Sequence, residues 1–257
     1  MLSAEQLSRY RRNILLPGIG EAGQARLLQA RVLVIGAGGL GSPAAYYLAA
    51  AGIGTIGLAD YDLVELSNLQ RQILHTTADL GLAKTESAAR KLRNLNPELK
   101  IQIFSSRMDQ HNIQAVIRGF DFVIEATDNF ESKFLINDAC LSAAVAFSHA
   151  GIREFEGQTM TVAPGVSACY RCVFLEPPPA GSLPPSAQLG VLGATAGIMG
   201  TLQAAETIKV LTGVGSPLHN CLLYCDTRTM DFRKVQVQPN PACPVCRAAR
   251  EKGSLNP

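Results

Sequence analysis

A glycine-rich turn between an apolar run and a helical pattern constrains this fold more than any other feature. The stretch VLVIGAGGLGS, residues 32–42, places Gly36, Gly38 and Gly41 in the order G-x-G-x-x-G. Glycines at these places permit a tight turn and close backbone approach, and the amides of the following helix can bind a phosphate. Asp60 ends the next apolar run, where an acidic residue can accept hydrogen bonds from ribose hydroxyls. The pattern therefore predicts a nucleotide site.

Apolar runs alternate with helical patterns through the first part of the chain. Runs typical of strands occupy residues 31–36, 55–60, 100–106, 121–127 and 146–151. Helical patterns occupy residues 40–52, 83–96, 110–118 and 129–145. Strands separated by helices in this way pair in parallel, with helices on both faces of the sheet. The sequence therefore predicts an α/β fold with a Rossmann-like, largely parallel sheet.

The second part of the chain departs from this alternation. Strands are expected at residues 157–165, 220–226 and 231–237, which would add antiparallel strands at the C-terminal side of the sheet. A long helix rich in glycine and alanine is expected at 189–211. Residues 176–190 contain five of the 14 prolines. Because proline cannot continue a helix or a central strand, we expect a mobile crossing segment there.

We expect one domain over residues 1–257. Its parts are an N-terminal helical arm (1–30), a nucleotide-binding core (31–150) and a C-terminal part (151–257). In the arm, two short helices are expected, broken at Pro17, Gly18 and Gly20.

Charge and hydropathy bear on the kind of binding partner and on the cellular location of the protein. The formal net charge of +2 gives no broad electrostatic reason to expect a nucleic acid or an anionic membrane. The N-terminus lacks the continuous apolar stretch of a secretory signal. The most apolar helical pattern is interrupted by Gln203, Glu206 and Lys209, so it is predicted to be a buried helix. We therefore expect a cytoplasmic protein.

Charged and polar side chains follow two of the predicted strands. Asn68, Gln70 and Arg71 come soon after the second strand, and Lys84 begins the next helix. Cations at this edge of an open sheet could neutralise a triphosphate, although a solvated loop with salt bridges would give the same pattern. Asp128 follows the fourth strand and can hold Mg²⁺ beside a polyphosphate. It can equally cap the helix that follows.

Four of the seven cysteines form two C-x-x-C pairs. In a chain without an export signal, two such pairs favour a tetrahedral zinc site with a structural role. A redox dithiol or ordinary buried cysteines are the alternatives. The paired residues are Cys169, Cys172, Cys243 and Cys246.

The other cysteines and the histidines show no such spacing. Cys140, Cys221 and Cys225 lie in apolar runs and are predicted to be core residues. The histidines have no spacing typical of metal ligands or of a catalytic triad, so each is predicted to be an ordinary core or surface residue. They are His75, His111, His149 and His219.

Several of these motifs, in the same order, resemble the MoeB/ThiF/HesA family of ubiquitin-activating-enzyme-like adenylyltransferases. They are GAGGLGS, DYDLVELSNLQRQ, LAKTESA and EATDN, and the likeness extends to RYRRNILL, YRC, GIMGTLQAAETIK and NPACPVC. Such enzymes use ATP and Mg²⁺ to adenylate the C-terminal glycine of a small, ubiquitin-like β-grasp sulfur carrier that ends in Gly-Gly, and they release pyrophosphate. The resemblance implies this activity, with a MoaD- or ThiS-like carrier.

The resemblance also implies roles for particular residues. Gly39 and the other turn glycines would approach the phosphates, and Asp60 would contact the ribose. Asn68, Arg71 and Lys84 would bind the phosphate chain, while Asp128 would hold Mg²⁺. Ser67, Gln70 and Asn129 lie in the matching motifs and join the nucleotide-binding set. The resemblance further implies a homodimer in which Arg12 reaches the partner's site.

One position departs from the pattern of the family. Several relatives carry a cysteine four residues before the GV pair, here residues 190–191, near the start of the long helix, and in some it links covalently to the carrier. Here the residue is Ser186. We therefore expect the reaction to stop at the acyl-adenylate, or a separate protein to donate the sulfur. The pathway, molybdopterin, thiazole or another, is left open. A nicotinamide-dependent oxidoreductase and a non-catalytic scaffold for a ubiquitin-like protein are the competing interpretations.

Overall fold

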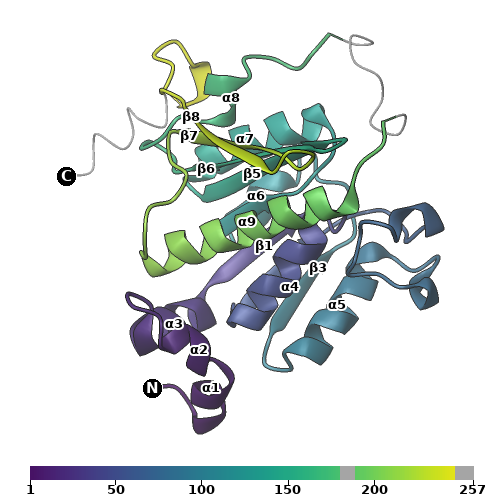
Figure 1. Ribbon diagram of the computed structural model, residues 1–257, viewed down its shortest axis with the longest axis vertical. Coiled ribbons are helices and arrows are strands. Elements are labelled where there is room, and N and C mark those ends of the chain that lie inside the picture. Colours follow the sequence, from purple (N-terminus) through teal and green to yellow (C-terminus); the bar gives the residue numbers. More distant parts are fainter. Residues whose placement is uncertain (180–188, 247–257) are drawn as a thin grey trace.

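The computed structural model describes residues 1–179 and 189–246 of the chain. In these residues eight strands form one sheet in the order β3-β2-β1-β4-β5-β6-β7-β8 (Figure 1). The strands are β1 (Arg31–Ile35), β2 (Thr55–Ala59), β3 (Lys100–Phe104), β4 (Phe122–Glu125), β5 (Ala146–Arg153), β6 (Glu156–Val162), β7 (Cys221–Asp226) and β8 (Asp231–Gln236). Neighbours from β3 to β5 pair in parallel, and neighbours from β5 to β8 pair antiparallel. The predicted fold class is confirmed.

Helices cover both faces of the sheet, and each face has its own hydrophobic core. One face carries the four helices α3 (Gly20–Gln29), α4 (Gly41–Ala51), α5 (Lys84–Leu95) and α9 (Gly193–Thr212). The other carries α6 (Ile113–Ile117), α7 (Phe130–Ala143) and the short α8 (Tyr170–Val173), which the sequence pattern did not predict.

The composition of α9 follows from its position. The helix packs against α4 and also against β5 and β6, so apolar residues surround much of it. A Cβ added at Gly200 would lie 2.1 Å from the carbonyl oxygen of Leu40, so only glycine lets the two helices approach this closely. The helix is buried against the protein, as predicted. Over the described residues no helix combines the length and the apolar character needed to cross a bilayer.

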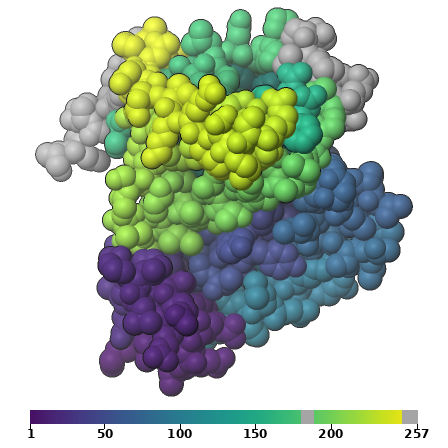
Figure 2. Space-filling model, viewed as in Figure 1, coloured from purple at the N-terminus to yellow at the C-terminus, as the bar shows by residue number. Residues whose placement is uncertain are grey.

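The N-terminal arm has three helices where two were predicted. They are α1 (Ala4–Arg9), α2 (Arg11–Ile14) and α3. The first predicted helix is interrupted at Tyr10, whose side chain is buried and whose hydroxyl accepts a hydrogen bond of 2.9 Å from Nδ2 of Asn96. Gln24 Nε2 donates to the carbonyl oxygen of Ala51. Ala51 and Asn96 lie at the C-terminal ends of α4 and α5, so the arm lies beside the amino ends of the parallel strands. In Figure 2 the arm (purple) and the strands β7 and β8 (yellow) lie at opposite ends of the visible face.

One predicted strand is longer in the structure than expected, and part of the predicted crossing segment is not described by the structure. Strand β5 continues to Arg153, two residues beyond the predicted strand, and a turn at Glu154 leads directly into β6. Of the predicted crossing segment, residues 180–188 lie outside the described residues, and Ser186 is among them.

Candidate nucleotide site and cysteine cluster

A cavity of about 830 Å³ opens at the carboxyl ends of the parallel strands. Its lining comes from the glycine turn after β1, the ends of β2 and β4, the first turn of α7, and strands β5 and β6. The structure brings to this cavity eight of the residues predicted from sequence. They are Gly36, Gly38, Gly39, Asp60, Arg71, Lys84, Asp128 and Asn129.

The glycine turn has the close packing that its motif predicted. Gly36 has φ of +100°, and a Cβ there would lie 2.5 Å from the carbonyl oxygen of Ala126. A Cβ at Gly41 would lie 1.8 Å from the carbonyl oxygen of Gly36. Asp60 fixes the turn, because its carboxylate accepts hydrogen bonds from the backbone amides of Ala37 at 2.8 Å and Asp62 at 2.9 Å. Asp60 therefore holds the backbone of the glycine turn in place.

Two predicted cations stand at one side of this turn. Lys84 is only 5% exposed, and its Nζ forms an ion pair of 2.8 Å with Asp62. The Arg71 side chain passes Gly39, and its Nη1 donates to the carbonyl oxygen of Ser67 at 3.1 Å. A salt-bridged loop was the alternative prediction, and the Lys84 pair agrees with it in part. Burial of Lys84 beside the cavity, however, distinguishes it from a solvated surface lysine.

In the part of the chain that the structure describes, five predicted residues do not line the cavity. They are Arg12, Gly41, Ser67, Asn68 and Gln70. Asn68 is buried and closes the short 3-10 helix Leu66–Asn68, because its Oδ1 accepts from the amide of Glu65. Arg12 is exposed on α2, beside the opposite ends of the strands. Any contact of Arg12 with a nucleotide therefore requires the site of another subunit, as the family resemblance implies.

Asp128 is an exposed residue at the edge of the cavity. The alternative prediction, that it caps α7, is wrong, because the cap is Asn129, whose Oδ1 accepts from the amide of Ser132 at 2.9 Å. The Asp128 carboxylate is thus not required by the helix end. A carboxylate beside a polyphosphate site is the ligand type that Mg²⁺ uses in proteins.

A buried ion pair, which no sequence pattern predicted, supports this edge of the cavity. Glu125, at the end of β4, accepts hydrogen bonds from Lys133 Nζ at 3.0 and 3.1 Å and from the amide of Thr127 at 2.8 Å. Burial raises the pKa of Glu125, but attraction to Lys133 and hydrogen bonds from His149 and Thr127 outweigh it and lower the pKa to about 2. Glu125 is therefore ionised at neutral pH.

Gln72 and His149 are two further cavity-lining residues that were not predicted as site residues. Gln72 is 4% exposed beside Gly38, and its Oε1 has no hydrogen-bond partner among the described residues. His149 donates from Nδ1 to Glu125 at 2.7 Å, while its Nε2 has no partner in the described part of the chain. The prediction that His75 is an ordinary core residue agrees with its two hydrogen bonds, to Ser87 and to the carbonyl oxygen of Ala37.

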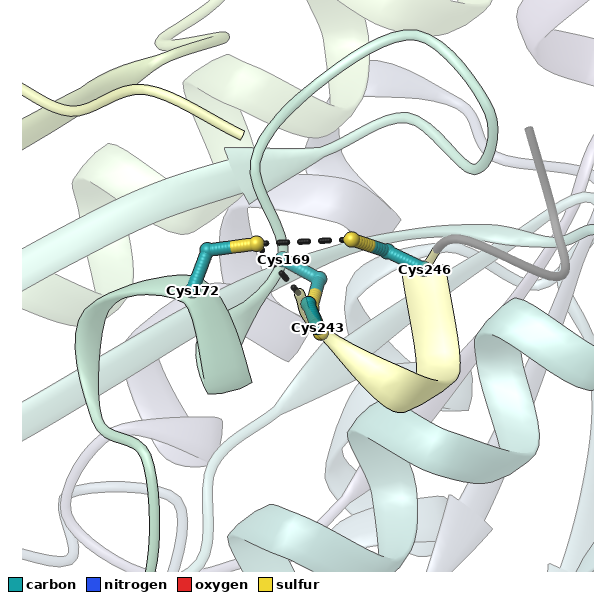
Figure 3. Close-up of side chains that lie close together, drawn as sticks. All are labelled: Cys169, Cys172, Cys243 and Cys246. Atoms are coloured by element: carbon teal, nitrogen blue, oxygen red, sulfur yellow. Dashed lines mark hydrogen bonds between the residues drawn. The ribbon is translucent and has the colours of Figure 1, made fainter. Parts of the chain in front are cut away.

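The four paired cysteines gather at one point, as predicted (Figure 3). Cys172 lies on α8, and Cys169 immediately precedes that helix. All four sulfurs lie within 4.8 Å of one another. Adjacent Sγ atoms are 3.4–3.8 Å apart, and thiolates around a tetrahedral Zn²⁺ would be about 3.8 Å apart. The arrangement fits zinc, and it is too open for disulfides. Cys140, Cys221 and Cys225 are buried, as expected of core residues.

Comparison of the sequence with known families and proteins gives a consistent result. The model of the ThiF family matches residues 10–245. The SAMP-activating enzyme E1 of Haloferax volcanii is 45% identical, over 95% of this chain and 90% of that protein. The sulfur carrier protein adenylyltransferase of Thermus thermophilus is 42% identical, over 94% of this chain and 91% of the relative.

Solved structures show the same fold. E. coli MccB in complex with MccA-N7isoASN superposes with a TM-score of 0.83 at 25% identity, over 93% of this chain and 74% of MccB. E. coli MccB with ATP gives a TM-score of 0.81 at 24% identity, over 95% of this chain and 76% of MccB. At this level of identity the likeness concerns the fold.

Proposed function

This chain belongs to the ThiF family, and from that premise we propose that it is an ATP-dependent adenylyltransferase of a ubiquitin-like sulfur-carrier protein. The substrate is the C-terminal glycine of a small β-grasp carrier of the MoaD or ThiS type that ends in Gly-Gly. The single observation that carries the proposal is the cavity that joins the glycine turn to Asp128, Lys84 and Arg71, in a chain 42% identical to a sulfur carrier protein adenylyltransferase.

The ATP phosphates lie against the glycine turn in this proposal. Backbone amides of the turn up to Gly41, the first residue of α4, bind phosphate oxygens, because helix N-termini attract anions. The amide of Ser42 already donates to the carbonyl oxygen of Gly38, and Pro43 has no N–H. Arg71 and Lys84 supply positive charge beside the turn. Asp60 holds the turn in place and accepts from the ribose. Asn129, which lines the cavity, and Ser67, Asn68 and Gln70, which do not, are proposed as further contacts.

If Mg²⁺ binds here, it would neutralise part of the negative charge of the ATP phosphates. Asp128 would hold this ion, because the residue lines the cavity and its carboxylate is not used to cap α7. The loop that carries Asp128 is held by buried bonds: Lys133 Nζ donates to the carbonyl oxygen of Thr127 at 2.7 Å. The chain therefore offers a metal ligand on a fixed backbone.

The chemistry needs position and charge more than an enzyme nucleophile. A carboxylate oxygen of the carrier's last glycine attacks the α-phosphorus of ATP, the bond from that phosphorus to the bridging oxygen breaks, and pyrophosphate leaves. Arg71, Lys84 and the amides of the turn stabilise the negative charge that grows on the leaving group. The product is the carrier's acyl-adenylate, ready for sulfur transfer from a donor protein.

We further propose that the cysteine cluster binds one Zn²⁺ and has a structural role. It joins the segment around α8 to the residues after β8, far from each other in sequence. We also propose a homodimer in which Arg12 completes the site of the other subunit, and a cytoplasmic location.

ATP–pyrophosphate exchange tests the proposed activity. Purified candidate carriers ending in Gly-Gly are added one at a time, each beside a version that lacks the two glycines. We expect exchange with at least one full-length carrier and none with its truncated form. A scaffold would bind the carrier without exchange, and an oxidoreductase would show nicotinamide absorbance changes without ATP. The activity of the relatives favours adenylation over both.

A further inference from the structure

His149 carries a buried nitrogen whose bonding is incomplete. The residue lies on β5 directly beside Glu125 of β4, its partner in the parallel ladder. Its side chain is 1% exposed, and its Nδ1 lies 2.7 Å from Oε2 of Glu125. Because Glu125 is an ionised acceptor, Nδ1 must carry the proton. Nε2 has no hydrogen-bond partner among the described residues.

The charge state of the ring decides what Nε2 can bind. Burial lowers the pKa of His149, and the positive charge of Lys133 lowers it further, against the opposing effect of Glu125. The ring is therefore neutral, with its proton on Nδ1. In that tautomer Nε2 offers a lone pair and can only accept a hydrogen bond. A buried acceptor without a donor is costly, so a donor is expected to arrive with a ligand.

Access to Nε2 comes from the side of Gly151. An added Cβ at Gly151 would lie 3.8 Å from His149 Nε2, an ordinary contact distance, so at this position no side chain stands between the nitrogen and the cavity. Gly151 and His149 both line the cavity. The rings of Tyr170 and Phe174 pack against the imidazole, with centroids at 4.5 and 6.4 Å. A group that enters the cavity can thus approach Nε2 over Gly151.

We propose that His149 Nε2 accepts a hydrogen bond from a backbone amide of the carrier's C-terminal tail, which crosses Gly151 on its way to the nucleotide. This inference rests on the proposed function. A peptide N–H is the donor that such a tail presents, whereas its terminal carboxylate and the phosphates of ATP are acceptors that a lone pair repels. His149 is therefore a substrate-binding residue of the tail and has no direct part in phosphoryl chemistry.

Three variants separate this contact from the support that His149 gives to Glu125. In His149→Asn the amide nitrogen can still donate to Glu125 from the place of Nδ1, but the acceptor at Nε2 is lost. In His149→Gln the side-chain amide reaches the place of Nε2 and can supply an acceptor. In Gly151→Ala the new Cβ covers Nε2, and its nearest contacts of 3.6–3.8 Å are ordinary ones, so the fold is retained.

Steady-state exchange is measured with a carrier that supports exchange by the unchanged enzyme. We expect the KM for the carrier to rise about three- to tenfold in His149→Asn and Gly151→Ala, as for one lost hydrogen bond, with the KM for ATP unchanged. His149→Gln should stay closer to the unchanged enzyme. If the KM for the carrier is unchanged in both His149→Asn and Gly151→Ala, the inference is overturned. A rise in the KM for ATP alone also overturns it, because the donor would then be the adenine amino group.

A spectroscopic measurement reports the contact directly. In ¹⁵N-histidine-labelled protein, the resonance of the unprotonated Nε2 of His149 is identified by its loss in His149→Asn. We expect it to shift when the full-length carrier is added and to stay in place with the carrier that lacks Gly-Gly. No shift with the full-length carrier contradicts the inference. If the unchanged enzyme shows no exchange with any carrier, the proposed function itself fails, which is a different result.

Discussion

Lys133 Nζ lies 3.0 Å from Oε2 of Glu125, and the two side chains are only 8% and 1% exposed. The same ammonium group donates to the carbonyl oxygens of Thr127 and Ala150, both at 2.7 Å. One buried cation thus joins the end of β4, the loop that carries Asp128, and β5. The ion pair positions the edge of the cavity on which the proposed Mg²⁺ and tail contacts depend.

Removal of the lysine should leave a buried, uncompensated carboxylate. We expect Lys133→Met to lower the free energy of unfolding by about 3–5 kcal/mol, measured by denaturant titration. The double variant Glu125→Gln with Lys133→Met should recover part of this loss, because it removes the charge together with its partner. A single variant as stable as the unchanged protein contradicts the importance assigned to the pair.

Local sequence signals predicted some of this architecture and missed the rest for a physical reason. The glycine turn could be predicted because its motif spans only a few residues, and a Cβ at Gly41 would meet the carbonyl oxygen of Gly36. The contact that excludes a side chain at Gly36 comes from the distant Ala126 and could not be predicted. The pairing of Glu125 with His149 depends on the register of two strands that are separated by α7. No local pattern specifies that register.

The predicted alternative role of Asp128 as the N-cap of α7 was wrong by one residue, because the N-cap is Asn129. Asp128 and Asn129 are both good N-cap residues, and only the backbone decides between them. The structure gives the cap to Asn129 and leaves Asp128 at the cavity. The gathering of the four cysteines, in contrast, could be predicted, because two C-x-x-C pairs in one chain favour a shared metal site.

Asp128 should be essential for exchange without being essential for folding. We expect Asp128→Ala to lose carrier-dependent ATP–pyrophosphate exchange while its unfolding transition stays near that of the unchanged protein, because the residue is exposed and caps no helix. Glu131→Ala is the matched control: it removes an exposed acid in the first turn of α7 that does not line the cavity and whose ion pair with Arg107 is exposed. Normal exchange in Asp128→Ala would falsify the metal-ligand role.

Zinc should be bound by the four paired cysteines alone. We expect metal analysis to find about one zinc per chain, and Cys243→Ser to lose most of it and to lower the thermal midpoint, because the ion couples to folding. Cys221→Ser, at a buried cysteine outside the cluster, should keep its zinc. A fully folded, metal-free preparation of the unchanged protein contradicts the structural role.

Arg12 supplies the sharpest test of the proposed dimer, because it lies at the end of the strands opposite the cavity of its own chain. If it acts on the partner's nucleotide, Arg12→Ala and Asp128→Ala should each abolish exchange in a homodimer. A mixed dimer of the two, co-expressed with different affinity tags, contains one site with Arg12 from one subunit and Asp128 from the other. We expect that dimer to have about half of the activity of the unchanged enzyme. An inactive mixed dimer would place both residues in one subunit's site, and a chain that never co-purifies with its tagged copy would rule out the homodimer.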